Sequence, residues 1–201
     1  MQPVAIVDSG GANIASLRFA LERLGAAAQL TCDPLELRAA PRVILPGVGA
    51  AGDAMQRLQA QGLAKLIASL TQPVLGICLG MQLLFESSAE NDVTCLGLIP
   101  GRVQRLEAHP DRPVPHMGWN QLRLSRASPL TKGIADGDYV YFVHSYAAGV
   151  GAGTLATCEY GGEFSAVVQR DNFFGTQFHP ERSATTGRRL LANFLALAEW
   201  S

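Results

Sequence analysis

The sequence is short of charge and has no long apolar run. Only 16% of its 201 residues are Asp, Glu, Lys or Arg, and the formal net charge is -1. A chain with this balance has no basic surface of the kind that binds nucleic acid or an anionic membrane. No apolar run reaches the roughly 18 residues that span a bilayer, and the first residues lack the basic start of a secretory signal. We therefore expect a cytoplasmic protein that binds neither nucleic acid nor membrane.

Cysteines are few and scattered. Cys32, Cys78, Cys95 and Cys158 form no C-x-x-C pair, so the sequence predicts no zinc site and no dithiol motif. With 48% hydrophobic residues the chain can bury a core without disulfides, and we expect reduced thiols. Residues 1–201 are expected to form one domain, because domains of this length commonly hold a single core.

The first half of the chain alternates strand and helix signals. Apolar runs typical of buried strands occur at 4–8, 42–47 and 73–77. Apolar residues at helical spacing predict helices over 14–24, 63–70 and 79–87. Strands joined by helices indicate parallel pairing, because a parallel return needs a long crossover.

The second half is rich in short β-type runs separated by Gly, Asn and Asp. These runs lie at 101–108, 118–125, 138–146, 153–160, 164–170 and 172–178. They predict antiparallel strands and hairpins added to the sheet. A closing helix is predicted within 187–200, with one face formed by Leu190, Leu191, Phe194, Leu195 and Ala198. The fold class is therefore α/β, with a mostly parallel central sheet flanked by helices and antiparallel strands in the C-terminal half.

One cysteine lies between two glycines directly after a predicted strand. Cys78 is the centre of Gly76-x-Cys78-x-Gly80 in "PVLGICLGMQ". A strand that turns abruptly into a helix strains its apex residue, and glycines two positions away relieve the crowding. The apex thiol then lies at a helix N-terminus, which favours the nucleophilic thiolate, and the N–H of Leu79 is placed to meet an oxyanion. From this motif alone, a buried structural cysteine is the alternative.

A second motif supplies candidate partners for the thiol. His179 stands in "FGTQFHPERS" after a strand-like run, and Pro180 favours an extended backbone at His179. In an extended chain His179 and Glu181 project to the same face, so the carboxylate can orient the imidazole. The prediction is a catalytic triad of Cys78, His179 and Glu181. A strand-end histidine beside a surface glutamate is the alternative.

A glycine-rich turn follows the second predicted strand. In "LPGVGAAGDAM", residues 45–55, Gly47 and Gly49 have no side chain to keep a ligand away from the backbone. The N–H groups of this turn could form the second half of an oxyanion hole. An ordinary glycine-rich turn is the alternative.

Together these motifs resemble a known family. "PGVG", "GICLGMQ" and "HPE", in this order and spacing, resemble the class I, triad-type glutamine amidotransferases. "PGVGAAGDAM", "VPHMGWN", "YFVHSY" and "GTQFHPERS" narrow the resemblance to the glutaminase subunits of imidazole glycerol phosphate synthase, which serve histidine biosynthesis. The resemblance spans nearly the whole chain. It implies the three-layer amidotransferase fold, with no cofactor and no metal.

The resemblance implies roles for individual residues. Cys78 would attack the side-chain amide of L-glutamine, His179 would transfer protons, and Glu181 would hold His179. The backbone N–H groups of Leu79 and Val48 would bind the oxyanion. The positions that match the glutamine site are Gly47, Gly49, Gln82, His144, Ser145 and Tyr146. The positions that match the partner interface are Asn13, Trp119, Tyr141 and Arg182.

The resemblance also implies a partner, a (β/α)8-barrel cyclase subunit that forms a heterodimer with this chain. That subunit would combine the ammonia with a phosphoribulosyl carboxamide, giving imidazole glycerol phosphate and an aminoimidazole carboxamide ribonucleotide. Because ammonia in neutral water is mostly protonated, a protected passage between the subunits is expected. Two departures concern the interface: "SGGAN" replaces a segment with an aromatic residue and one glycine, and Arg182 stands where lysine is common.

Two other functions fit parts of the sequence. A γ-glutamyl hydrolase, or the glutaminase of another pathway, would keep the triad, although "PHMGWN" argues against it. A degenerate relative that acts only as a scaffold or regulator would need no triad, whereas all three triad positions are filled.

Overall fold

A computed structural model of the chain describes residues 3–8 and 14–197. Within these residues, eight strands form a central sheet in the order β2-β1-β3-β4-β14-β13-β12-β9. The strands from β2 to β14 in this order are parallel, and the remaining three are antiparallel to their neighbours. The strands are β1 Val4–Val7, β2 Ala28–Thr31, β3 Val43–Leu45, β4 Val74–Ile77, β9 Arg123–Leu124, β12 Thr154–Glu159, β13 Glu163–Arg170 and β14 Phe173–Thr176.

Both faces of the parallel strands are buried, which explains their uninterrupted apolar sequences. In β1, Val4 and Ile6 belong to one hydrophobic cluster, whereas Ala5 and Val7 belong to another. Successive side chains point to opposite faces of a strand, so one short apolar run contributes to two cores.

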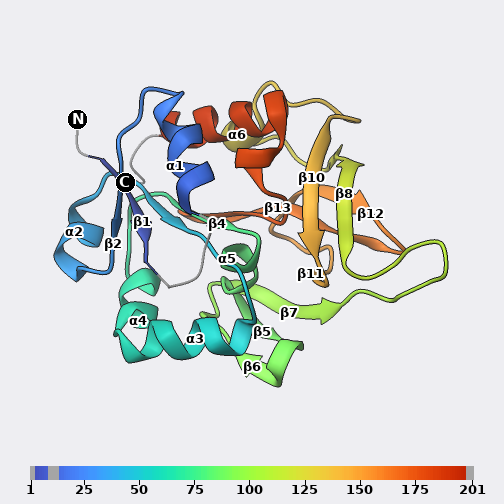
Figure 1. Cartoon of the computed structure of the whole chain (residues 1–201), viewed down its shortest axis with the longest axis horizontal. Helices are drawn as coiled ribbons and strands as arrows, with labels where there is room; N and C mark the ends of the chain where they lie inside the picture. Colours follow the sequence, from blue (N-terminus) through green and yellow to red (C-terminus); the bar gives the residue numbers. More distant parts are fainter. Residues whose placement is uncertain (1–2, 9–13, 198–201) are drawn as a thin grey trace.

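Helices cover both faces of the sheet (Figure 1). α1 and α6 supply apolar side chains to the cluster on one face, and α2, α3 and α4 supply those of the other. The helices are α1 Ile14–Glu22, α2 Pro34–Ala39, α3 Ala51–Ala60, α4 Leu63–Ala68 and α6 Ala184–Ala196. The resulting three layers confirm the predicted α/β fold with a mostly parallel central sheet.

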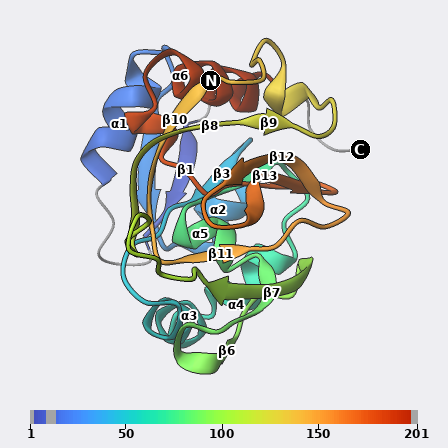
Figure 2. The same ribbon diagram turned by 90° about the vertical axis from the view of Figure 1, so that its right-hand side faces the viewer.

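Several strands of the second half lie outside the central sheet. β8 His116–Gln121 and β10 Tyr139–His144 form a separate antiparallel pair. A further sheet has the order β11-β7-β5-β6, in which β5 and β7 are parallel. Figure 2 shows β11, β7 and β6 of this sheet on the side of the molecule where α3 and α4 lie. Its strands are β5 Phe85–Ser88, β6 Val93–Thr94, β7 Ile99–Arg105 and β11 Tyr146–Ala148. The prediction that all the short runs join the central sheet was therefore wrong for β7, β8, β10 and β11, because a β-rich run specifies a strand but not its partner. β5 and β6 were not predicted as strands.

Two helix predictions also need correction. The helix predicted over 79–87 is one turn long, α5 Leu79–Gln82, and the chain then enters β5. The Leu84 carbonyl accepts hydrogen bonds from the N–H groups of Leu98 and Ile99, both at 2.8 Å, so pairing with a distant segment overrides the local helical pattern. α3 was not predicted, because its start lies in the glycine-rich stretch after β3.

The C-terminal helix ends at Ala196, and Ala198 lies outside the described residues. Leu190, Leu191 and Phe194 of its predicted face are buried. No helix within the described ranges combines the length and the apolar character that a bilayer crossing requires.

Candidate active site

Cys78 lies at a sharp turn between β4 and α5. Its backbone has φ 54° and ψ -111°, which a residue with a side chain rarely adopts. A Cβ atom added to Gly80 would lie 1.8 Å from the Leu45 carbonyl oxygen, and one added to Gly76 would lie 2.6 Å from the Gly80 carbonyl oxygen. The turn therefore requires glycine on both sides of the cysteine, as the motif predicts.

His179 and Glu181 approach the thiol from the end of β14. His179 Nδ1 lies 2.9 Å from Glu181 Oε1, and since a carboxylate only accepts, Nδ1–H is the donor. The imidazole also interacts with Cys78, and this interaction acts to raise the pKa of His179. His179 is extended as predicted, with φ -93° and ψ 101°, but Pro180 begins a 3-10 turn, η3 Pro180–Arg182. The turn, rather than the expected extended chain, brings Glu181 onto the ring, because proline favours the first position of a helix.

The charge state of His179 is set by these two neighbours. Burial acts to lower the pKa of His179, but the hydrogen bonds and charges of Cys78 and Glu181 outweigh burial and raise this pKa well above its ordinary value of 6.5. Glu181 Oε2 is buried and has no hydrogen-bond partner among the described residues. The arrangement favours a protonated imidazole beside the Cys78 sulfur at neutral pH.

The glycine-rich turn packs directly on the elbow. A Cβ atom on Gly47 would lie 2.7 Å from the Gly80 nitrogen and 2.8 Å from Leu79 Cβ. Leu79 is the first residue of α5, and the first N–H groups of a helix have no partner within it. Val48, in the same turn, lines the cavity described next. Two backbone segments with N–H groups thus meet beside the sulfur.

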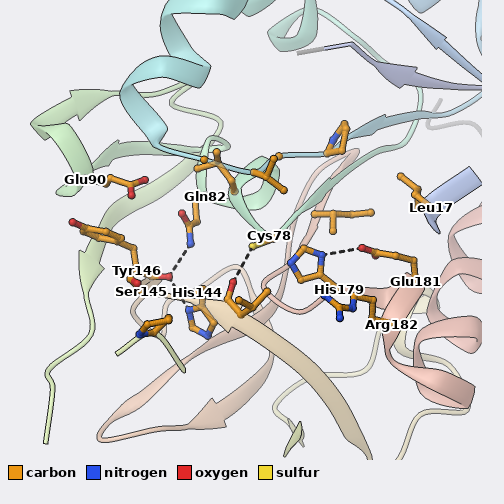
Figure 3. A pocket seen from close by; sticks show the side chains of 18 residues that line it. Leu17, Cys78, Gln82, Glu90, His144, Ser145, Tyr146, His179, Glu181 and Arg182 are labelled. Carbon is orange, nitrogen blue, oxygen red and sulfur yellow. Dashed lines mark hydrogen bonds and ion pairs between the residues drawn. The ribbon is translucent and has the colours of Figure 1, made fainter. Parts of the chain in front are cut away.

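A cavity of about 440 Å³ opens over the thiol (Figure 3). All the residues predicted for the triad, the oxyanion hole and the glutamine site line it: Gly47, Val48, Gly49, Cys78, Leu79, Gln82, His144, Ser145, Tyr146, His179 and Glu181. Leu17, Glu90, Pro115 and Arg182 also line it. Glu90 was not singled out from the sequence, because its segment carries no motif and only the fold brings it to the cavity.

Hydrogen bonds fix the wall of the cavity around Tyr146. Gln82 Nε2 donates to the Tyr146 carbonyl at 2.7 Å, and His144 Nδ1 donates to the same oxygen at 2.8 Å. Burial lowers the pKa of His144 to about 3, so its ring is neutral and Nε2 accepts from His116 Nδ1 at 3.0 Å. His144 therefore orders the wall rather than transferring protons.

The residues predicted for a partner interface form a patch beside the cavity. Trp119 and Tyr141 face each other across the β8–β10 pair with ring centroids 5.9 Å apart, and the Arg182 guanidinium carbon lies 4.6 Å from the Tyr141 centroid. Met117 and Trp119 are 63% and 52% exposed. Asn13 lies outside the described residues.

Among the described residues, no group of three or more His, Cys, Asp or Glu side chains could hold a metal ion.

The same fold occurs in a solved glutamine amidotransferase. Its crystal structure superposes with a TM-score of 0.74 at 20% sequence identity, covering 96% of this chain and 96% of that chain. Residues 5–198 match the family model described as glutamine amidotransferase class-I. The chain belongs to this family and is an enzyme that acts on the amide of glutamine.

More specific similarity comes from two relatives that match nearly from end to end. The chain is 55% identical to imidazole glycerol phosphate synthase subunit HisH of Xylella fastidiosa, over 98% of both chains. It is 56% identical to the subunit of the same name from Xanthomonas axonopodis pathovar citri, over 98% of this chain and 99% of the relative. These similarities confirm the resemblance to the glutaminase subunits of imidazole glycerol phosphate synthase that the sequence motifs indicated.

Proposed function

We propose that the chain is the glutaminase subunit of imidazole glycerol phosphate synthase. It hydrolyses L-glutamine to glutamate and ammonia and delivers the ammonia to a cyclase subunit in histidine biosynthesis. The observation that carries the proposal is the contact of Cys78, His179 and Glu181 at one cavity. The names of the two relatives, at 55% and 56% identity, support the particular pathway.

In the first step, the Cys78 thiolate, with protonated His179 beside it, forms a bond through Sγ to the side-chain amide carbon of glutamine. The amide oxygen becomes negative, and the N–H groups of Leu79 and Val48 bind it. His179 gives its proton to the departing nitrogen, the C–N bond breaks, and ammonia leaves a γ-glutamyl thioester on Cys78. The raised pKa of His179 keeps this proton on the ring until the nitrogen takes it.

In the second step, the now neutral His179 removes a proton from water. The water oxygen bonds to the thioester carbon, the C–S bond breaks, and glutamate leaves while Cys78 returns to the thiolate. Glu181 stabilises the imidazolium that forms in this step through the 2.9 Å contact at Nδ1. No cofactor is needed, because water is the only other reactant.

The cavity offers groups for both ends of glutamine. The Glu90 carboxylate is held by the Ala51 N–H at 2.8 Å, and its charge suits the α-ammonium group of the substrate. Gln82 uses Nε2 within the protein, which leaves Oε1 to accept from a substrate N–H. Ser145 and Tyr146 contribute the facing wall of the cavity.

We further propose that the cyclase partner is a (β/α)8 barrel and that it docks on the patch of Met117, Trp119, Tyr141 and Arg182. Exposed aromatic side chains and an arginine are typical of interface anchors. The patch adjoins the cavity through Arg182, so docking there places the partner next to the site where ammonia is released. The chain acts as one cytoplasmic domain in this complex.

Replacement of the nucleophile tests the proposal. Cys78→Ala should abolish glutamine hydrolysis, whereas the complex with the cyclase partner should still form product from added ammonium salts. Cys32→Ser is the matched control, because Cys32 is an exposed cysteine that does not line the cavity, and it should retain both activities. Glutamate release by Cys78→Ala at the wild-type rate would refute the assignment. Full glutaminase activity without any partner would favour an independent hydrolase.

A further inference from the structure

The side-chain amide of Gln177 contacts the sulfur of Cys78 from within the protein. Gln177 Nε2 lies 3.7 Å from Cys78 Sγ, and the Gln177 side chain is fully buried. Gln177 lies between β14 and His179 but is not one of the residues that line the cavity. It therefore contacts the thiol without lining the cavity, and the steps above do not use it.

Neighbouring groups fix which end of this amide faces the sulfur. The Tyr146 carbonyl can only accept, so the group of Gln82 that lies 2.7 Å from it must be the NH2. The second hydrogen of that NH2 points to Gln177 Oε1 at 3.0 Å. With its oxygen occupied by Gln82, Gln177 presents its own NH2 to Cys78. A reversed Gln177 amide would set two NH2 groups against each other and an oxygen against the sulfur.

We propose that Gln177 is a further catalytic residue of the glutaminase, whose amide N–H stabilises and orients the Cys78 thiolate. The inference rests on the proposed function, since it concerns the nucleophile of that reaction. Gln82, which was assigned above to the glutamine site, also orients the Gln177 amide so that its NH2 points to the sulfur.

The contacts of the sulfur distinguish its two charge states. The thiol S–H has an acceptor in the Val143 carbonyl, 3.8 Å from Sγ. After Cys78 loses its proton, the Val143 carbonyl cannot hydrogen-bond to the anionic sulfur, because both groups only accept. The N–H groups of Gln177 and His179 are donors and can stabilise the thiolate. Hydrogen bonds to an ionised acceptor are roughly twice as strong as neutral ones, so the Gln177 donor stabilises the thiolate more than the thiol. The same bond helps the sulfur to leave when the thioester is hydrolysed.

Alkylation of Cys78 tests this inference without requiring glutamine turnover. In a Cys32→Ser background, the rate of Cys78 modification by iodoacetamide is measured at pH 7 by mass spectrometry and expressed per folded protein. Gln177→Met removes the donor at similar volume, and Gln177→Glu replaces the NH2 with oxygen. Gln72→Met is the matched control, because Gln72 is another buried glutamine, and its Nε2 donates to the Leu37 carbonyl at 2.8 Å, away from the cavity.

Both Gln177 variants should alkylate about tenfold more slowly than wild type, the factor expected from loss of one charge-assisted hydrogen bond. Gln72→Met should react at the wild-type rate even if its stability falls. Wild-type alkylation in folded Gln177→Met or Gln177→Glu would overturn the inference, as would an equal loss in Gln72→Met. A glutaminase assay of the wild-type complex runs in parallel. Its failure would refute the proposed function, whereas the alkylation rates address Gln177 alone.

Discussion

Replacing Gly80 with alanine sets two physical effects against each other. Gly80 lies within α5, and helix propensity alone predicts that alanine stabilises the protein by about 1 kcal/mol. The added Cβ, however, would lie 1.8 Å from the Leu45 carbonyl oxygen. Since non-bonded carbon and oxygen atoms normally come no closer than ~3.3 Å, the two backbone segments would have to separate by about 1.5 Å.

The strand that carries this carbonyl cannot yield easily. Leu45 lies in β3, which pairs with β1 on one side and with β4 on the other, and its side chain is fully buried. Overpacking of such a core typically costs about 1–3 kcal/mol, and contact with backbone puts Gly80→Ala at the upper end. Set against the gain of about 1 kcal/mol from helix propensity, this cost leaves a net loss of about 2 kcal/mol in the free energy of unfolding. For a chain of this length the melting temperature should fall by about 4–8 °C.

Urea unfolding followed by circular dichroism measures this free energy, with glutaminase activity of the complex as a second readout. Gly162→Ala is the control, because a Cβ there would meet no atom within 4 Å and its φ is not positive. It should change stability by less than about 0.5 kcal/mol. A Gly80→Ala protein as stable as wild type, or more stable, would show that the elbow has room for a side chain and would refute the steric explanation of the motif.

Two further predictions concern the charge pair and the proposed interface. Glu181→Gln removes the carboxylate beside His179, so the pKa of His179 should fall and the ring should lose its proton at lower pH in an NMR titration. The pKa of His179 is higher in the folded protein than in the unfolded chain. The stability advantage of wild type over Glu181→Gln should therefore be full below about pH 6.5 and should shrink as the pH rises through the folded-state pKa of His179. Identical titrations of His179 in the two proteins would contradict this. Trp119→Ala should weaken binding to the cyclase partner by about 30-fold in calorimetry, with little change in stability. Val150→Ala, which alters a side chain equally exposed at 52%, should bind like wild type, and equal effects of the two substitutions would argue against the interface.

Local features of the chain were predictable because their causes are local. The apolar runs at 4–8, 42–47 and 73–77 contain β1, β3 and β4, since burial on both faces of a parallel sheet demands uninterrupted apolar sequence. The glycines around Cys78 indicated the elbow, because the crowding that they relieve involves atoms within a few residues of the turn and one neighbouring strand. The nearness of His179 and Glu181 likewise follows from their separation by one residue, although the turn at Pro180 replaced the expected extended chain.

Contacts between segments distant in the sequence could not be predicted from local sequence patterns. The run at 79–87 has a helical pattern, but Leu84 pairs with the segment that begins β7, and the chain continues as β5. Glu90 and Gln177 carry no motif that indicates a site, and their roles emerge only from the atoms that surround them.

The sequence by itself determined that this chain has a strained cysteine elbow, a histidine–glutamate pair and the strands of an α/β core, because each depends on neighbouring residues. Only the tertiary structure decided that these parts meet. β14 lies parallel to β4 with Thr176 opposite Ile77, and the Cys78 N–H donates to the Thr176 carbonyl at 2.8 Å. Both strands therefore end at the same edge of the sheet, and this register brings both His179 and Gln177 to the sulfur of Cys78.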